Sequence, residues 1–288
     1  MMSGITKVTI GGRAILVKRE DLLHPYVSGN KFRKLKYNIL QALDLGASEI
    51  ISFGGAFSNH IHALSYACKF YNIPLVLFIR GEEIDNPTLR FVKHNGAELI
   101  FVDRTSYREI KTTIAFAEYP NAYVIPEGGS NKLALEGIKE MMSEIKETNI
   151  HYCVPYGSGA TSIGMMAAMQ DTDHLHVFSA LKMKDFAADF KERSISLDVP
   201  IRNVTFHDQY HFGGFAKHRP ELIQFINQFE IPLDPLYTGK MMFGIADLIE
   251  SNYFAPEDKI IAIHTGGLQG IAGFNARFGN LINPQHSQ

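Results

Sequence analysis

The sequence has little cysteine and no tryptophan. Cys68 and Cys153 are the only cysteines among its 288 residues, which excludes a framework of disulfide bonds and suits a reducing compartment. Both cysteines lie in apolar stretches, so we expect them to be small core residues rather than reactive thiols. These features favour a cytoplasmic protein.

An excess of charge of either sign is also missing. The 28 lysines and arginines nearly balance the 30 aspartates and glutamates, so nothing indicates a nucleic-acid partner. The longest apolar runs, such as 74–79 and 260–263, have the length of strands and cannot span a bilayer. We therefore expect no membrane partner. The first residues also lack the apolar stretch of a secretory signal, so we expect the mature protein to begin near residue 1.

Short apolar or β-branched runs alternate with longer amphipathic ones along the chain. This alternation predicts an α/β fold with two open, twisted, mostly parallel sheets and helices on both faces. We expect a smaller domain at residues 44–130 and a larger domain at residues 1–43 plus 131–288. Ligand sites in such folds lie at the carboxyl ends of the strands.

The hydrophobic periodicity locates the individual elements. The predicted strands are residues 49–53, 75–79, 99–102, 122–125, 151–155, 175–180, 203–206 and 259–264. The predicted helices are residues 58–71, 86–94, 107–119, 134–146, 162–170, 184–193, 220–229 and 239–252.

One lysine follows a flexible Gly-Asn step where we predict a helix to start. Lys31 has Arg33 and Lys34 as basic neighbours, and burial beside other cations would lower the pKa of its amine. Such an amine can form a Schiff base with the aldehyde of a cofactor. The alternative is a basic helix start on the protein surface.

Four glycine-containing loops follow predicted strands, where functional groups often lie. In the first, Ser58 and Asn59 fall near a helix N-terminus, which can hold a carboxylate, and Asn59 can offer its amide to a bound ring. The second, residues 157–162, leaves backbone N–H groups free for an anion. It lacks the pattern of a nucleotide P-loop or a dinucleotide fingerprint, so a single phosphate monoester fits best. Helix capping and a tight structural turn are the alternatives.

The other two loops and two tyrosines are less specific. The third loop, residues 265–270, could cradle an anion or present the Thr265 hydroxyl to a ring atom, whereas we interpret the fourth, residues 127–131, as structural. Tyr210 and Tyr237 lie in loops. A loop tyrosine can serve as an acid–base group if nearby cations lower its pKa, and is otherwise a packing residue.

Histidines raise the question of a metal. The twelve include His60 with His62, His174 with His176, and His207 with His211. No Cys/His or His-Glu-x-x-His pattern accompanies them. We interpret them as ordinary polar residues and predict no metal site.

Five motifs follow one another along the chain. They are Gly29-Asn30-Lys31-x-Arg33-Lys34-Leu35, Gly54-Gly55-x-x-Ser58-Asn59-His60, Gly157-Ser158-Gly159-x-Thr161, Asp234-Pro-x-Tyr237-Thr238-Gly239-Lys240 and His264-Thr265-Gly266-Gly267. From about residue 14 to residue 270 the chain therefore resembles the pyridoxal-phosphate enzymes of the 1-aminocyclopropane-1-carboxylate deaminase/D-cysteine desulfhydrase family, in which these motifs occur in the same order. The resemblance implies a fold like that of the tryptophan synthase β subunit, a larger domain that binds pyridoxal phosphate, and a homodimer.

The resemblance also implies roles for the matching residues. Lys31 would carry the cofactor covalently, Asn59 would contact its ring hydroxyl, and Thr265 would face its ring nitrogen. Lys31, Tyr237 and Ser58 would be catalytic, Tyr237 by assisting proton transfer or departure of the leaving group. The expected phosphate ligands are Lys34, Gly157, Ser158, Gly159, Ala160 and Thr161, and the expected substrate contacts among the matching residues are Ser58, Asn59, His60 and Tyr237. Residues 171–220 match the family poorly. We expect this region to line the substrate pocket, and therefore expect Tyr210 to contact the substrate as well.

Two features of the sequence favour elimination among the reactions of this family. The family's deaminases have glutamate after the tyrosine of the Asp-Pro-x-Tyr motif, whereas Thr238 follows Tyr237 here, as in the desulfhydrase branch. A hydroxyl rather than a carboxylate at the ring nitrogen favours elimination over transamination. We expect α,β-elimination from D-cysteine or a related D-amino acid. The alternatives are ring-opening deamination of 1-aminocyclopropane-1-carboxylate and a non-catalytic α/β protein that binds a phosphorylated ligand.

Overall fold

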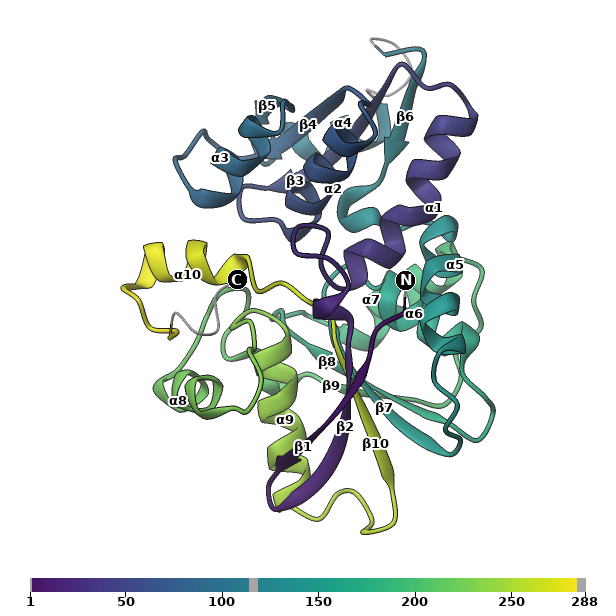
Figure 1. The fold of residues 1–288 in the computed structure, drawn as a ribbon, viewed down its shortest axis with the longest axis vertical. Coiled ribbons are helices and arrows are strands. Elements are labelled where there is room, and N and C mark those ends of the chain that lie inside the picture. The colour runs from purple at the N-terminus through teal and green to yellow at the C-terminus, as the bar shows by residue number, and fades with distance from the viewer. Residues whose placement is uncertain (1, 114–118, 284–288) are drawn as a thin grey trace.

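Two β-sheets, one above the other in Figure 1, organise the chain. The structure is a computed structural model that describes residues 2–113 and 119–283. The smaller sheet is entirely parallel, in the order β5-β4-β3-β6. It comprises β3 (Glu49–Gly55), β4 (Leu75–Arg80), β5 (Glu98–Val102) and β6 (Ala122–Ile125). Its helices are α2 (Asn59–Phe70), α3 (Pro87–His94) and α4 (Ser106–Thr113).

The larger sheet has six strands in the order β1-β2-β10-β7-β8-β9. Only β1 (Ile5–Ile10) is antiparallel, to β2 (Arg13–Arg19), and the other neighbours are parallel. The remaining strands are β7 (Ile150–Tyr156), β8 (His174–Ser179), β9 (Val204–His207) and β10 (Lys259–His264). The remaining helices are α1 (Asn30–Asp44), α5 (Lys132–Ser143), α6 (Ala160–Ala168), α7 (Phe186–Ser196), α8 (Pro220–Gln228), α9 (Thr238–Glu250) and α10 (Gly270–Phe278).

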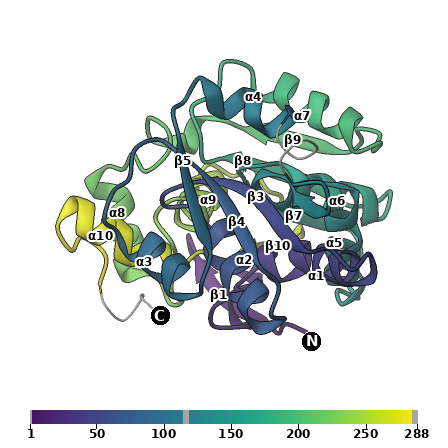
Figure 2. The same ribbon diagram turned by 90° about the horizontal axis from the view of Figure 1, so that it is seen from above.

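Hydrophobic cores cover both faces of the larger sheet. Along β10, Ile260 and Ala262 belong to one buried cluster, whereas Ile261 and Ile263 belong to another. Successive side chains of a strand point to opposite faces, so helices must cover both faces of a parallel sheet built this way. Viewed from above, α5, α6 and α7 lie along one side of the assembly and α8 and α10 along the other (Figure 2).

The predicted α/β class is confirmed, with several corrections to individual elements. The hairpin β1–β2 and helix α10 were not predicted. The strand β2 carries three charged residues, Arg13, Lys18 and Arg19, so its sequence does not have the pattern of a buried strand. Charged residues of this segment are buried in the structure, among them Lys18, Glu20 and Asp21. The predicted helix at 107–119 begins one residue earlier, as α4, and its residues 114–118 lie outside the described part.

Other expectations concern the cysteines, the domain boundaries and the membrane. Cys68 and Cys153 are buried as predicted, and burial raises the pKa of each thiol. The smaller sheet lies within residues 44–130, but the assignment of the remaining residues to one domain stays a prediction. In residues 2–113 and 119–283, no helix combines the length and apolar character needed to cross a bilayer.

Candidate active site

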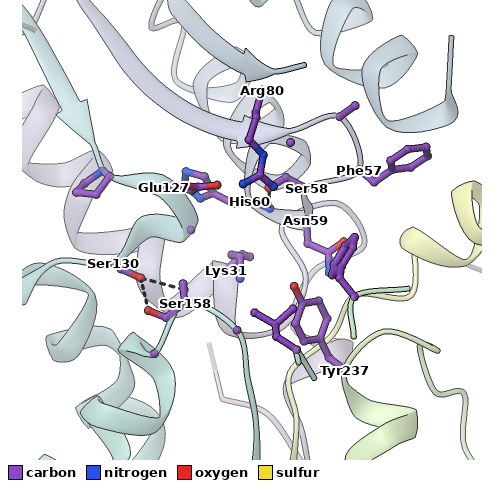
Figure 3. A pocket seen from close by; sticks show the side chains of 18 of the residues that line it. Lys31, Phe57, Ser58, Asn59, His60, Arg80, Glu127, Ser130, Ser158 and Tyr237 are labelled. Atoms are coloured by element: carbon purple, nitrogen blue, oxygen red, sulfur yellow. Dashed lines mark hydrogen bonds between the residues drawn. The ribbon is translucent and has the colours of Figure 1, made fainter. Parts of the chain in front are cut away.

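A cavity of about 1530 Å³ opens between the carboxyl ends of the two sheets. The smaller sheet contributes residues that follow β3, β4 and β5, and the larger sheet contributes residues that follow β7 and β10. Figure 3 shows Lys31 in the middle of this cavity. Most of the predicted site residues line it: Lys31, Ser58, Asn59, His60, Gly157, Ser158, Gly159, Thr161, Tyr237 and Thr265.

Gly29 brings Lys31 into the cavity. Its φ of +65° is in the left-handed region, and a Cβ there would lie 1.9 Å from the carbonyl oxygen of Thr265. Only glycine tolerates both the dihedral and the contact. The backbone N–H of Asn30 then donates to the same Thr265 oxygen at 3.1 Å. Helix α1 therefore begins directly against the loop after β10, and its second residue is Lys31.

The amine of Lys31 is prepared to act as a nucleophile. Burial lowers its pKa to about 8, so a substantial neutral fraction exists near neutral pH. Its Nζ donates to Oδ1 of Asn30 at 3.1 Å, and Nδ2 of Asn30 donates to Oγ1 of Thr161 at 2.9 Å. Asn30 thus connects the lysine to the loop after β7. Asn30 was not among the predicted site residues.

The loop after β7 has the features of a phosphate site. Gly159, with φ +87°, is the N-cap of α6, so the first backbone N–H groups of this helix have no intrahelical acceptor. Nζ of Lys34 donates to Oγ of Ser158 at 3.1 Å, and Oγ of Ser130 donates to the same oxygen at 2.9 Å. Ser130 was missed because we interpreted its loop as structural.

Lys34 supports this loop from behind and does not line the cavity. Its side chain is completely buried, and its pKa is well below the ordinary lysine value because of burial, then the charges of Lys31 and Arg193. Arg193 lies beside the loop, since a Cβ on Gly159 would be 3.0 Å from its Cδ. A dianion bound at the loop would stabilise the charged forms of these cations.

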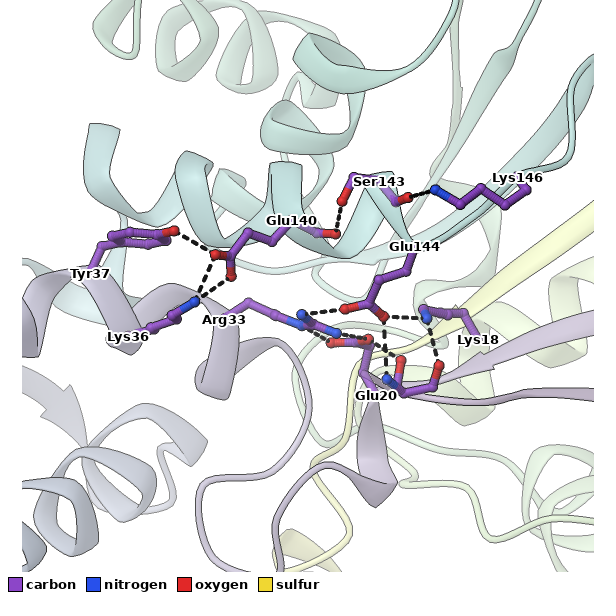
Figure 4. Close-up of polar contacts among 10 residues, drawn as sticks. Lys18, Glu20, Arg33, Lys36, Tyr37, Glu140, Ser143, Glu144 and Lys146 are labelled. Atoms are coloured by element: carbon purple, nitrogen blue, oxygen red, sulfur yellow. Dashed lines mark hydrogen bonds and ion pairs between the residues drawn. The ribbon is translucent and has the colours of Figure 1, made fainter. Parts of the chain in front are cut away.

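A buried charge network holds α1 in position (Figure 4). The guanidinium of Arg33 contacts Glu20 at 2.8 Å and Glu144 at 2.7 Å, and Nζ of Lys18 contacts Glu144 at 2.6 Å. Burial alone would raise the pKa of Glu144, but the hydrogen bonds from Arg33 and Lys18 outweigh burial and lower it. This carboxylate therefore stabilises the fold at neutral pH, and the contribution is lost as the pH falls below the ordinary range of glutamate.

Glu144→Gln is expected to lower the free energy of unfolding by about 3–5 kcal/mol, because it leaves buried cations without their partner. The matched control is Glu140→Gln on the same segment, since Glu140 pairs with Lys36 at 2.7 Å and both side chains are more than one-third exposed. That change should cost less than about 1 kcal/mol. Urea unfolding at pH 7 measures both, and equal midpoints for the two variants would contradict the stabilising role of the network.

The amino end of α2 forms another wall. Oγ of Ser58, the N-cap, accepts the backbone N–H of His60 at 3.2 Å. The amide of Asn59 lies close to Gly267, where a Cβ would be 2.9 Å from its Nδ2. The glycine therefore leaves room for the Asn59 side chain beside the loop after β10, where a bound ring could contact it.

The side chain of His60 has one ring nitrogen, Nδ1, that can accept a hydrogen bond. Its Nε2 is 2.8 Å from Oγ of Ser52, and Ser52 already donates its hydrogen to the carbonyl of Ile125 at 2.7 Å. This network assigns the ring hydrogen to Nε2. Nδ1 is buried and has no hydrogen-bond partner in the described part of the chain. Burial, followed by the charges of Lys31 and Lys34, keeps the pKa of His60 well below its usual value. In this tautomer His60 has no N–H for a carboxylate, so the predicted carboxylate contact is left to Ser58 and the α2 backbone.

Tyr237 lies at the start of α9, across Gly157. The carboxylate of Asp234 accepts the backbone N–H groups of Leu236, Tyr237 and Thr238, and fixes the turn. Burial and then the negative charges of Asp234 and Glu127 raise the pKa of Tyr237. Cations therefore do not lower this pKa, and the phenol stays neutral and available as an O–H donor.

Two further residues lie away from the cavity. Oγ1 of Thr238 donates to Asp234 at 2.5 Å, so its hydroxyl is used by the turn. Tyr210 was predicted to contact the substrate, but it does not line the cavity. Its hydroxyl donates to Asp247 at 2.6 Å, and its ring packs near Phe178. The prediction for Tyr210 is corrected: it is a core residue that anchors α9.

These features fit a phosphorylated aldehyde with an aromatic ring. A buried amine with a lowered pKa, a donor-rich loop backed by cations, and a side-chain amide beside a ring-sized space are the groups that pyridoxal phosphate requires. The sequence profile described as "Pyridoxal-phosphate dependent enzyme" matches residues 6–266. The chain belongs to this family. It is therefore an enzyme that uses pyridoxal phosphate.

Individual relatives confirm the narrower resemblance. A Thermotoga maritima protein, provisionally named a 1-aminocyclopropane-1-carboxylate deaminase, is 30% identical, with 90% of each chain covered. The bifunctional D-cysteine desulfhydrase/1-aminocyclopropane-1-carboxylate deaminase of Arabidopsis thaliana is 29% identical over 90% of this chain and 74% of its own. A crystal structure of an ACC deaminase homologue is 27% identical, with a TM-score of 0.83 over 98% of this chain and 94% of that one. These relatives support a pyridoxal-phosphate dependent lyase.

Proposed function

We propose that this protein catalyses α,β-elimination from D-cysteine or a related small D-amino acid, giving pyruvate, ammonia and, from cysteine, sulfide. The observation that carries the proposal is the position of the half-buried Lys31 in the cavity, where its amine, with a pKa of about 8, lies beside a phosphate-type loop and opposite the neutral phenol of Tyr237. When bound, pyridoxal phosphate supplies the electron sink for carbanion formation.

Different residues would bind different parts of the cofactor. We assign covalent attachment to the Lys31 amine, the phosphate to the loop 157–161, the ring hydroxyl to Asn59 and the ring nitrogen to the Thr265 hydroxyl. Lys34, which was predicted to bind the phosphate, would act through Ser158 from behind the loop. Ala160 contributes only its backbone N–H at the start of α6. Thr265 is buried at the end of β10 and offers a hydroxyl rather than a carboxylate, which supports elimination rather than transamination.

The same residues would move the protons of the reaction. Ser58 and the amino end of α2 orient the substrate carboxylate, and the free Lys31 amine removes the proton from Cα. The electron pair left on Cα forms the double bond to Cβ as the Cβ–S bond breaks. Tyr237 donates its proton to the departing sulfur. Water hydrolyses the released aminoacrylate, so that cysteine and one water give pyruvate, ammonia and hydrogen sulfide.

A second reaction has support from the names of the relatives. Ring opening of 1-aminocyclopropane-1-carboxylate would give 2-oxobutanoate and ammonia, and the Arabidopsis relative is named for both reactions.

We also propose that the protein is a homodimer and is located in the cytoplasm. Both proposals follow from the sequence expectations alone.

A substrate panel tests the proposal. The purified holoenzyme is incubated with D-cysteine, L-cysteine, D-serine, β-chloro-D-alanine and 1-aminocyclopropane-1-carboxylate, and pyruvate, 2-oxobutanoate and sulfide are measured. We expect pyruvate from the D-amino acids and sulfide from D-cysteine. Release of 2-oxobutanoate alone would replace elimination by ring opening, and release of neither keto acid would contradict both reactions.

A further inference from the structure

Arg80 points into the cavity but has no ionic partner among the described residues. It is the last residue of β4 and lies beside Gly55 of β3 in the sheet register. Figure 3 shows its side chain directed from the end of the strand toward Lys31. No carboxylate of residues 2–113 or 119–283 lies within ion-pair distance of it, and its guanidinium stands 5.7 Å from the ring centre of Tyr107.

Most other charged residues on this wall already have an ion-pair or hydrogen-bond partner. Lys111 pairs with Glu127 at 3.0 Å, and Glu83 pairs with Lys93 at 2.5 Å. The carboxylate of Asp103 accepts the backbone N–H groups of residues 105 and 106 at the start of α4.

Four charged residues of this wall have no oppositely charged partner in the described chain. Arg80 and Arg104 are cations, whereas Glu82 and Asp103 are carboxylates. All four are solvent-exposed. The wall as a whole therefore has no excess of positive charge, but the guanidinium of Arg80, which points into the cavity, is free to bind an anionic group.

The cavity also has room beyond the groups already assigned. Its volume of about 1530 Å³ exceeds the range of roughly 300–1,000 Å³ that is usual for ligand pockets. In Figure 3, Ser130 and Ser158 of the phosphate loop lie on the opposite side of Lys31 from Arg80. The phosphate of the cofactor would thus not reach Arg80, whereas the side chain of a bound amino acid could extend toward it.

We propose that Arg80 determines specificity by binding an anionic group on the substrate side chain. The preferred substrates are β-substituted alanines whose leaving group is itself an anion, such as a phosphate or a carboxylate-bearing thiol. This inference rests on the proposed elimination and names its substrate class. For O-phosphoserine, the Cα proton goes to the Lys31 amine, and the electron pair of the broken Cβ–O bond leaves with phosphate. With one water the products are pyruvate, ammonia and phosphate.

The affinity of the enzyme for two amino acids that cannot undergo elimination tests this proposal without depending on turnover. Alanine and 2-amino-3-phosphonopropanoate lack a leaving group, and each is titrated as both enantiomers into the holoenzyme while the cofactor absorbance is followed. We expect the phosphonate to bind about tenfold to a hundredfold more tightly than alanine, since hydrogen bonds to charged groups contribute about 1.5–3 kcal/mol. In Arg80→Gln this preference should disappear, while alanine binding stays within about twofold.

Arg90→Gln is the matched control. Arg90 is an exposed arginine of α3 that pairs with Asp85 at 2.7 Å and does not line the cavity, so its variant should keep the wild-type preference. Equal weakening of both ligands in Arg80→Gln would assign Arg80 to the α-carboxylate and overturn the proposal, as would a wild-type enzyme that does not prefer the phosphonate. If neither ligand alters the absorbance of the wild-type holoenzyme, the proposed amino-acid chemistry fails, and the specificity proposal fails with it.

Discussion

Lys31→Ala is expected to abolish turnover and the visible absorbance of the covalently attached cofactor. The residue would supply both the covalent anchor and the group that removes the α-proton, and general acid–base catalysis alone contributes about 10²–10⁴-fold. We therefore expect pyruvate formation to fall by about 10⁴-fold or more. The absorbance spectrum after dialysis and the rate of pyruvate release measure the two effects.

Lys36→Ala is the control for this experiment. Lys36 lies on the same helix, is partly exposed and pairs with Glu140, so its variant should keep the wild-type spectrum and rate.

The pKa of about 8 for Lys31 predicts that attachment of the cofactor depends on pH. The neutral amine is the reactive form, so the rate at which apoenzyme takes up the cofactor should rise with pH and level off above about pH 8. An active Lys31→Ala enzyme would remove Lys31 from the mechanism.

Tyr237→Phe is expected to lower kcat by about 10²–10⁴-fold for D-serine, whose hydroxyl leaves poorly without a proton. The raised pKa of Tyr237 keeps the phenol protonated, so its loss removes a proton donor and not a base. β-Chloro-D-alanine provides an internal control, because chloride departs without protonation and its rate should fall less than about tenfold. Pyruvate release from both substrates is the measurement.

Equal losses for the two substrates would contradict the role of Tyr237 as a proton donor to the leaving group. They would instead indicate a positioning role, because the ring packs against Gly157, where a Cβ would be 3.0 Å from it. Thermal unfolding of Tyr237→Phe separates either role from a loss of folding.

Much of the fold could be predicted because the responsible signals are local. Alternating strand and helix patterns are encoded in neighbouring residues, and the turns after β3, β7 and β10 are marked by glycine. The same glycines indicated the cavity, since parallel strands end at one edge of a sheet. The hairpin β1–β2 was missed because β2 carries charged residues. Burial of Lys18 there is compensated by a distant partner, since Glu144, 126 residues later, pairs with it.

The fine structure of the site depends on contacts between distant segments. Asn30 meets Thr161, and Ser130 meets Ser158, across separations that no spacing pattern reveals. The state of His60 follows from Ser52, whose hydrogen is already donated to a backbone carbonyl. Tyr210 was expected at the substrate because residues 171–220 were expected to line the substrate pocket, but its hydroxyl donates to Asp247 instead.

Every role proposed for this site depends on covalent attachment of the cofactor to one specific lysine. To locate it, the holoenzyme is reduced with borohydride, digested, and mapped by mass spectrometry, which places the pyridoxyl group on a peptide. We expect this mass on Lys31, whose amine lies in the cavity with a pKa of about 8. Attachment to another lysine, such as the buried Lys34 or Lys240, or an unmodified Lys31 after full reduction, would contradict the proposed role of Lys31.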